Sequence, residues 1–432
     1  MSITRHLSVF ASETPAAQIP ETALRMMQLS FLDWAAVGIA GRDEPVSRIT
    51  REMVLDEGGA PRATLIGHGA RVPARAAALS NGATSHALDY DDTHFAHIGH
   101  PSVAVIPAAL AVAEQTGADG AALQEAALIG VEASIRVGVW LGRNHYQTGF
   151  HQTATAGAFG AGLAAARLMR LDAQGCAMVL GLLATRASGL KSQFGTMGKP
   201  FNAGLAAANG VEAADLVARG FVANPEALES AQGFGPTHAG ENLNIGLETL
   251  GKEWLFETVS HKFHACCHGL HAVLEAGLTL APLKTDAIER IEVTTHPRWM
   301  TVCNQVAPMT GLGAKFSYGT VLAMQVLGHD TAVLESYSDA VCADPAVQAL
   351  RARVQVTADD SVAETATRLR VVLRDGSLRE AAHDLNAPMT LEARQAKIQT
   401  KARSLLGAPR ADSLWSLIEG KAEARSFAEC LK

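Results

Sequence analysis

The chain has 432 residues, of which 48% are hydrophobic and 18% charged, as is typical of a globular protein with a large interior. This length exceeds what one ordinary hydrophobic core holds, so we expect two domains. A net charge of −7 without a basic stripe argues against nucleic acid as a partner. The six cysteines are irregularly spaced, and neither a secretory signal nor a long apolar run is evident. We therefore expect a cytoplasmic protein without a membrane span or a disulfide framework.

Helical patterns dominate the first 255 residues, with one short strand-like stretch at 63–67. Small residues fill many of these helices, which lets their axes approach closely. Gly117, Gly142 and Gly220 are placed as C-terminal stops. We expect a compact, all-helical domain over 1–255, with helices at 21–41, 43–59, 72–86, 102–116, 121–141, 153–169, 173–188 and 200–219.

The character of the sequence changes after residue 255. Residues 288–296 and 353–359 alternate like half-buried strands, and 367–383 predicts a hairpin that turns at Asp375–Gly376. An α+β domain is therefore expected over 256–390. The chain is helical again over 391–432, which we expect to rejoin the first domain. The predicted fold class is mainly α, with a large all-helical domain and a smaller α+β domain.

The segment 83–104, ATSHALDYDDTHFAHIGHPSVA, gathers acids and histidines between apolar flanks. Such groups are costly to bury unless they are paired, so they indicate an active-site wall. Pro101 predicts a helix that starts near Ser102, which places His100 where free backbone N–H groups favour anionic ligands. The alternative is a loop of capping aspartates and ordinary polar histidines. The polar set is Asp89, Asp91, Asp92, Thr93, His94, His97 and His100.

Two more polar clusters lie at expected helix entrances. His145 and His151 bracket a loop within 142–157, and Lys199 precedes Pro200 at the start of another helix. A lysine at a helix start opposes the macrodipole, unless its ammonium points at an anion. The segment is not a P-loop, because Pro200 stands where the hydroxyl residue belongs. The alternative for a histidine at such a place is an ordinary capping or core residue. The alternative for Lys199 is a solvated surface side chain.

The run HKFHACCHGLHA at 261–272 is rich in histidine and cysteine. On a helix, His264, His268 and His271 would share one face, so a zinc site is an alternative interpretation. Adjacent Cys266 and Cys267 do not easily point inward together, which disfavours it. Further along, Tyr318 in 314–320 is either a core aromatic or a proton donor.

These motifs together resemble the MmgE/PrpD family, whose members dehydrate, decarboxylate or epimerise small polycarboxylates. The resemblance rests on ALDYDDTHFAHIGHPS, TGFHQTATAGAFGAG, FGTMGKPFNAGLAAANG and the Lys262–Cys267 segment, and it covers almost the whole chain. It implies a large helical domain, a smaller α+β lid, a homodimer and chemistry without a cofactor or metal.

The resemblance also implies the site residues. Two features depart from the decarboxylating members. Cys267 stands where they have a further histidine, and the stretch from Thr93 to His100 is one residue longer. The implied catalytic residues are Asp89, His100, His151 and Tyr318, and the implied substrate-binding residues are Thr93, Lys199, Lys262 and Cys267.

The residue chemistry agrees with a small di- or tricarboxylate as the substrate. Lys199 and Lys262 supply cationic anchors. His100 and His151 are suited to proton transfer near neutral pH, and Asp89 to orienting one of them. We expect a cofactor-independent lyase, with dehydration of a 2-methylcitrate-like acid as the leading reaction. Epimerisation and decarboxylation are the alternatives within this chemistry. A zinc-dependent hydrolase and a non-catalytic carboxylate-binding protein are the alternatives from other classes.

Overall fold

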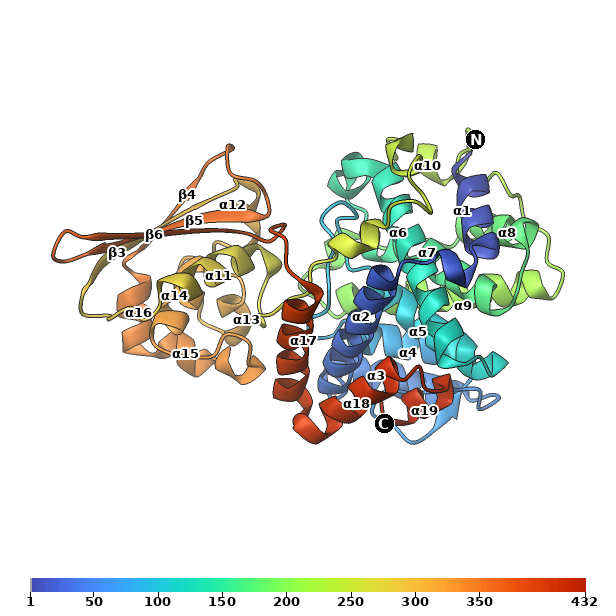
Figure 1. Ribbon diagram of the computed structural model, residues 1–432, viewed down its shortest axis with the longest axis horizontal. Coiled ribbons are helices and arrows are strands. Elements are labelled where there is room, and N and C mark those ends of the chain that lie inside the picture. The colour runs from blue at the N-terminus through green and yellow to red at the C-terminus, as the bar shows by residue number, and fades with distance from the viewer. Residues whose placement is uncertain (1) are drawn as a thin grey trace. The chain divides into compact units, whose positions relative to one another are not determined.

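The computed structural model describes residues 2–432, and the chain forms two compact units. The first unit runs up to His261 and resumes over Leu391–Lys432, and the second is Lys262–Thr390 (Figure 1). The fold is mainly α, as the sequence predicts. No helix in residues 2–432 is both long and apolar enough to cross a membrane.

The first boundary follows His261 rather than residue 255, because the residues between them pair with the first unit. The backbone N–H of Phe256 donates to the Glu132 carboxylate at 2.9 Å. Ser260 and Thr93 exchange two backbone hydrogen bonds of 2.8 and 2.9 Å. The alternating strand pattern that signals the second unit begins only later, at residue 288.

Helices make up most of the first unit. Its one sheet is a two-stranded antiparallel pair, β1 (Ala63–Thr64) with β2 (Arg71–Val72), so the unit is not strictly all-helical. Its helices are α1 (Ile3–Glu13), α2 (Glu21–Ala40), α3 (Pro45–Glu57), α4 (Ala74–Ser85), α5 (Ser102–Thr116), α6 (Gly120–Thr148), α7 (Gln152–Leu168), α8 (Ala173–Leu183), α9 (Gly198–Ala218), α10 (Phe234–Thr237), α17 (Leu391–Leu406), α18 (Ala408–Glu419) and α19 (Ala424–Glu429).

Helix α7 lies at the centre of this unit, packed against α5, α6 and α9. Nearly all of its residues are buried. Glycine permits the closest of these approaches: a Cβ on Gly160 would lie 2.3 Å from the carbonyl oxygen of Gly130. The small residues of these helices thus bring the loops at their ends close together.

The C-terminal helices do rejoin the first unit. In Figure 1, α17 lies beside α2, and the two helices are in contact. Lys401 of α17 is buried and pairs with Asp33 of α2 at 2.6 Å. Its ammonium also donates to the backbone carbonyl of Tyr90 at 2.6 Å. The C-terminal part of the chain therefore contacts the polar segment 83–104 through the backbone of Tyr90.

Several expected boundaries differ from the structure. Helix α6 continues to Thr148, but Gly142 breaks its helical geometry with φ 72°, as the expected stop implies. Helix α8 ends at Leu183 instead of residue 188. The last helical stretch splits into α18 and α19, because Gly420 closes the first of them.

The second unit is built on a four-stranded sheet with strand order β4-β3-β5-β6. Strand β3 pairs parallel with β4 and antiparallel with β5, and β5 and β6 form the expected hairpin, with Gly376 at φ 82°. Helix α11 packs on β5 and β6. The elements are β3 (Ile288–Thr295), β4 (Val354–Ala358), β5 (Ala366–Leu373), β6 (Leu378–Asp384), α11 (His271–Leu280), α12 (Arg298–Val302), α13 (Gly311–Ala314), α14 (Tyr318–Val326), α15 (Asp339–Ala343) and α16 (Pro345–Arg351).

Candidate active site

The polar segment forms the connection from α4 to α5. Helix α5 begins at Ser102 directly after Pro101, as predicted, so His100 stands at its entrance. Asp89 adopts the left-handed region with φ 51°, and so does Ile98 with φ 54°. Non-glycine residues seldom take this conformation, and strained backbone of this kind is found at functional sites, among other places. The segment is thus bent to present particular side chains.

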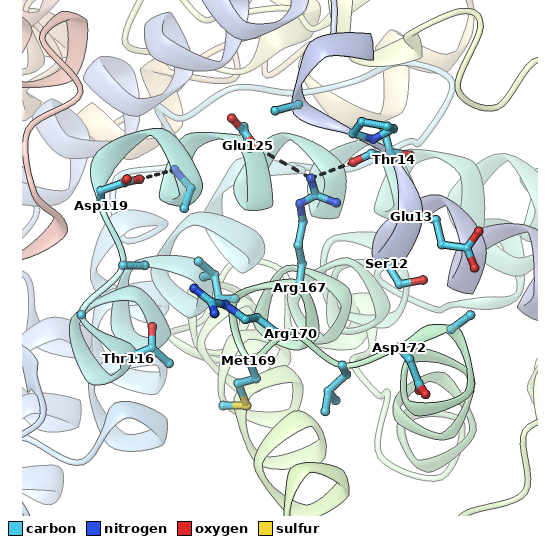
Figure 2. Close-up of a pocket in the computed structure, with 18 of the residues that line it drawn as sticks. Ser12, Glu13, Thr14, Thr116, Asp119, Glu125, Arg167, Met169, Arg170 and Asp172 are labelled. Carbon is cyan, nitrogen blue, oxygen red and sulfur yellow. Dashed lines mark hydrogen bonds and ion pairs between the residues drawn. The ribbon is translucent and has the colours of Figure 1, made fainter.

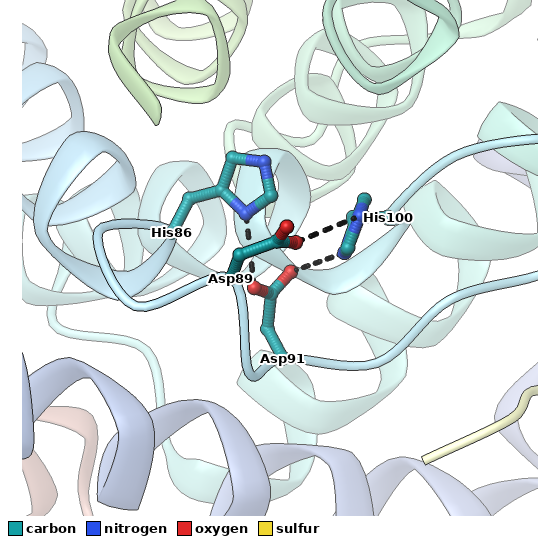
Figure 3. A group of neighbouring side chains, drawn as sticks. All are labelled: His86, Asp89, Asp91 and His100. Carbon is teal, nitrogen blue, oxygen red and sulfur yellow. Dashed lines mark hydrogen bonds and ion pairs between the residues drawn. The ribbon is translucent and has the colours of Figure 1, made fainter. Parts of the chain in front are cut away.

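The buried carboxylate of Asp91 bridges two imidazoles. Its Oδ1 lies 2.9 Å from His86 Nδ1, and its Oδ2 lies 2.8 Å from His100 Nδ1. Figure 3 shows His86 on one side of the carboxylate and His100 on the other. Burial raises the pKa of Asp91, but the two imidazoles outweigh this and hold that pKa well below its usual value. Asp91 is therefore ionised and fixes a proton on Nδ1 of each ring.

The second nitrogen of His100 faces another carboxylate. His100 Nε2 lies 3.4 Å from Asp89 Oδ1. The same oxygen lies 2.8 Å from the ammonium of Lys199, in the first turn of α9. An anion thus meets the lysine at the helix start, as its unfavourable placement predicts. A continuous chain of charges runs from Asp91 through His100 and Asp89 to Lys199.

His151 stands at the entrance of α7, as predicted, and is 2% exposed. The side-chain amide of Asn202 donates to its Nδ1 at 3.2 Å, so Nε2 carries the proton of the neutral ring. Burial lowers the pKa of His151 well below its ordinary value, and the neighbouring Lys199 and His86 lower it further. The Phe194 ring meets it edge-on at 5.0 Å. This histidine is a neutral hydrogen-bond donor at neutral pH.

Asp92 points away from this cluster and caps α5. Its carboxylate accepts from the backbone N–H of Ser102 at 3.3 Å, from the Ser102 hydroxyl at 2.5 Å and from the Ser30 hydroxyl at 2.9 Å. Burial raises the pKa of Asp92 to about 7, although these hydrogen bonds oppose the rise. The capping interpretation therefore holds for this one of the three aspartates.

Thr93 and two of the other histidines have structural partners. Thr93 is half-buried and pairs with Ser260. His94 Nε2 contacts the Leu255 carbonyl at 2.9 Å. His145 Nε2 contacts the Thr155 hydroxyl at 2.9 Å. These two histidines thus match the ordinary interpretation, as satisfied interior side chains.

The remaining expected site residues belong to the second unit. Lys262 is 2% exposed. The backbone N–H of Cys267 donates to the Lys315 carbonyl at 2.9 Å. The Tyr318 hydroxyl donates to the Gly269 carbonyl at 2.8 Å and lies 3.0 Å from the Thr295 hydroxyl. Burial raises the pKa of Tyr318, so its hydroxyl keeps its proton. The roles expected for these three residues stay predictions.

The histidine and cysteine run does not lie on one helix, because α11 begins only at His271. His264 Nδ1 contacts the Thr331 hydroxyl at 2.7 Å, and its ring packs edge-on against His271 at 5.1 Å. Within residues 2–432 this run does not bring three potential metal ligands together. All six cysteines are free thiols. The arrangement disfavours the zinc interpretation.

One group in the described chain does bring potential ligand atoms within 4.8 Å of one another, namely His86, Asp89, Asp91 and His100. Its donor set fits a cation poorly. The Lys199 ammonium already neutralises Asp89, and both Nδ1 atoms are protonated toward Asp91. The arrangement is instead suited to holding and moving a proton.

A polar groove of about 1230 Å³ lies elsewhere in the first unit (Figure 2). It is lined by the end of α1 and by the turns before α6 and α8, and none of the expected site residues lines it. Its Arg167 donates to the backbone carbonyls of Ala11 and Thr14 at 2.8 and 2.9 Å. That arginine fastens α1 to the end of α7, which is a structural role.

Sequence reasoning missed His86 and Asn202. His86 stands three residues before Asp89 and five before Asp91, at the end of α4. Its place inside the polar segment was the available signal. Asn202 gave none, because its contact with His151 depends on how α7 and α9 pack.

Comparison with known proteins covers nearly the whole chain. The MmgE/PrpD N-terminal domain model matches residues 5–244, and the MmgE/PrpD C-terminal domain model matches 264–419. A cis-aconitate decarboxylase of Aspergillus terreus is 26% identical over 460 aligned positions, which cover 97% of this chain and 93% of the relative. A cis-aconitate decarboxylase of Homo sapiens is 24% identical, over 97% of this chain and 91% of the relative.

Proposed function

Since this chain belongs to the MmgE/PrpD family, we propose that it is a cofactor-independent lyase that removes CO₂ from a small unsaturated polycarboxylate such as cis-aconitate. The observation that carries the proposal is the Asp91–His100–Asp89 array beside Lys199 and His151. Relatives named cis-aconitate decarboxylase favour decarboxylation over the dehydration expected from the sequence.

His100 is the proton donor of this reaction. Its two ring nitrogens face two carboxylates, and this environment favours the positively charged ring. When the C–C bond to a carboxylate breaks, CO₂ leaves and the electron pair stays on the substrate, spread over a neighbouring carboxylate. Transfer of the His100 proton to carbon forms the new C–H bond. The ring then regains a proton from solvent, so one proton is consumed for each CO₂ released.

His151 stabilises the charge that develops before this transfer. It is neutral, and Asn202 orients it so that Nε2–H is the donor. A neutral imidazole can hydrogen-bond an enolate-like oxygen without protonating it. The two histidines thus differ in protonation because their surroundings differ, which is how one site provides an acid and a separate donor.

Lys199 and Lys262 are the proposed anchors for the remaining carboxylates. Lys199 pairs with Asp89. A substrate carboxylate can replace Asp89 as the partner of this ammonium. Thr93 and Cys267 are proposed to contact the substrate, and Tyr318 to act as a further hydroxyl donor. That residues of both units meet around one substrate is part of the proposal, as is a homodimer, which sedimentation at micromolar concentration tests.

Dehydration of a 2-methylcitrate-like acid is the second candidate. Cys267 supports it, because the family resemblance implies a histidine at that position in the decarboxylating members. The same two histidines would serve as base and acid for loss of water. Epimerisation would need two bases on opposite faces of one carbon.

One experiment separates these reactions. The protein is incubated in deuterated water with cis-aconitate, 2-methylcitrate and iminodisuccinate, each followed by NMR. We expect CO₂ and a product with one deuterium on carbon from cis-aconitate, at a rate that a chelator does not change. Water loss from 2-methylcitrate alone would establish the second candidate. Deuterium exchange without net reaction would indicate an epimerase, and loss of all turnover with chelator would contradict the mechanism.

A further inference from the structure

We infer that His86 is a positioning residue, which shares the Asp91 carboxylate with His100 and so sets how strongly His100 holds its proton. The inference rests on the proposed proton-donor role of His100. It adds a residue that the sequence motifs of the family resemblance did not bring into the site.

His86 lies in a closely packed part of the first unit. It caps the C-terminus of α4 and is 1% exposed. Helix α4 packs closely on α9, where a Cβ on Gly82 would lie 2.8 Å from the Cα of Gly204. A ring held by such packing keeps its orientation toward Asp91. Its distance to the carboxylate is therefore a property of the fold.

The contacts of the His86 ring give it one polar function. Nδ1 lies 2.9 Å from Asp91 Oδ1, and Nε2 is buried without a hydrogen-bond partner among residues 2–432. A buried ring nitrogen left without a partner is rare in folded proteins and calls for a reason. A purely structural histidine, such as His145, has partners on both nitrogens. His86 instead offers a single bond, and the acceptor is the group that orients the proton donor.

The two imidazoles compete for one carboxylate. Their ring centroids are 4.5 Å apart, so a positive charge on one ring disfavours a charge on the other. Burial raises the pKa of Asp91, and both imidazoles lower it through their charge and their hydrogen bonds, the charge of His86 being the largest of these lowering causes. A carboxylate already bonded by His86 attracts the His100 proton less strongly. His86 therefore makes His100 a better acid than it would be alone with Asp91.

Other charged and titratable groups lie around this pair of imidazoles. Asp89 faces His100 Nε2, and Lys199 neutralises Asp89. The His151 ring lies 6.2 Å from that of His86. Replacing His86 leaves the contacts of Asp89 with His100 and Lys199 in place, so a change in the titration of His100 reports on the loss of His86 beside the shared carboxylate.

The test compares His86→Phe with His86→Asn and with the matched control His145→Asn. The Phe variant removes the donor to Asp91, and Asn retains a donor near the position of Nδ1. We expect the Phe variant to move the protonation midpoint of His100, followed by NMR on ¹⁵N-histidine-labelled protein, upward by about half to one pH unit. The alkaline limb of kcat/KM for cis-aconitate should move equally. The Asn variant should shift both by less than half as much, and the control should shift neither.

A Phe variant with lower kcat but unchanged midpoint and alkaline limb would overturn the inference and assign His86 a structural role. If that variant does not fold, the wild-type protein decides: the His86 Nδ1 signal must move as His100 titrates, and an unmoved signal overturns the inference. The NMR measurements need no turnover. Failure of the proposed reaction on every acid would thus be distinguishable from failure of this inference.

Discussion

The polar segment 83–104 and the run 261–272 are both rich in histidine, but their histidines have different surroundings. In the first, Asp91 and Asp89 face both nitrogens of His100. In the second, His264 bonds the Thr331 hydroxyl, and burial lowers the pKa of His271 well below its ordinary value, with His268 and His264 adding to the effect. A carboxylate at hydrogen-bonding distance on each side makes an imidazole a proton carrier. The buried His271 ring stays neutral and acts as an interior side chain.

The sharpest test of this difference replaces one histidine from each region. His100→Asn and His151→Asn should each lower kcat by on the order of 10²–10⁴-fold, the usual effect of losing a positioned acid or donor. His264→Asn should change kcat by less than about tenfold, because its ring contacts the Thr331 hydroxyl and the Glu275 carboxylate of its own unit and has no expected substrate role. Steady-state kinetics with cis-aconitate measures all three. Equal losses in the two regions would remove the distinction.

The lysines test whether residues of both units meet at one substrate. Lys199→Met and Lys262→Met should each raise KM by an amount worth on the order of 1.5–3 kcal/mol, as expected for a lost charged hydrogen bond. Lys191→Met is the matched control, since that ammonium donates to the Tyr146 carbonyl at 3.1 Å and has no expected substrate role. An unchanged KM in the Lys262 variant would restrict the site to the first unit.

The smallest expected effect concerns stability rather than turnover. The pKa of Asp92 is raised from 3.8 to about 7 by burial, so folding favours its protonated form. Stability from this group is complete below about pH 4 and is lost as pH rises through about 7. Asp92→Asn should therefore lose less stability than the wild type between pH 5 and 8, by a few kcal/mol at most. Urea unfolding at several pH values measures this, and parallel curves for the two proteins would contradict it.

Local signals predicted most of the fold. Glycine stops, Pro101 and the Asp375–Gly376 turn act through the backbone conformation of a few neighbouring residues, so their outcome can be read from the sequence. The short helices around the second sheet were not predicted, because segments of four to seven residues carry little periodicity. The strand order was also unreadable, since the parallel pairing of β3 with β4 depends on packing across long sequence separations.

The candidate site was predictable where a motif and a helix entrance coincide, as for His100, His151 and Lys199. Closeness in the sequence alone could not show which role each residue has. Asp91 and Asp92 are neighbours in the sequence, yet one orients two imidazoles and the other caps α5. The difference comes from the direction of each side chain, which the left-handed turn at Asp89 helps to set.

The buried contact from Lys401 to the Tyr90 carbonyl spans 311 residues of sequence. A ribosome delivers Tyr90 early and Lys401 only after the whole second unit has been made. During synthesis the earlier helices of the first unit can therefore pack first. The loop that carries Asp89 and Asp91 gains its hydrogen bond from Lys401 only afterwards. Closure of so distant a contact is a late event in folding. Completion of the proposed catalytic loop is thereby coupled to completion of the polypeptide.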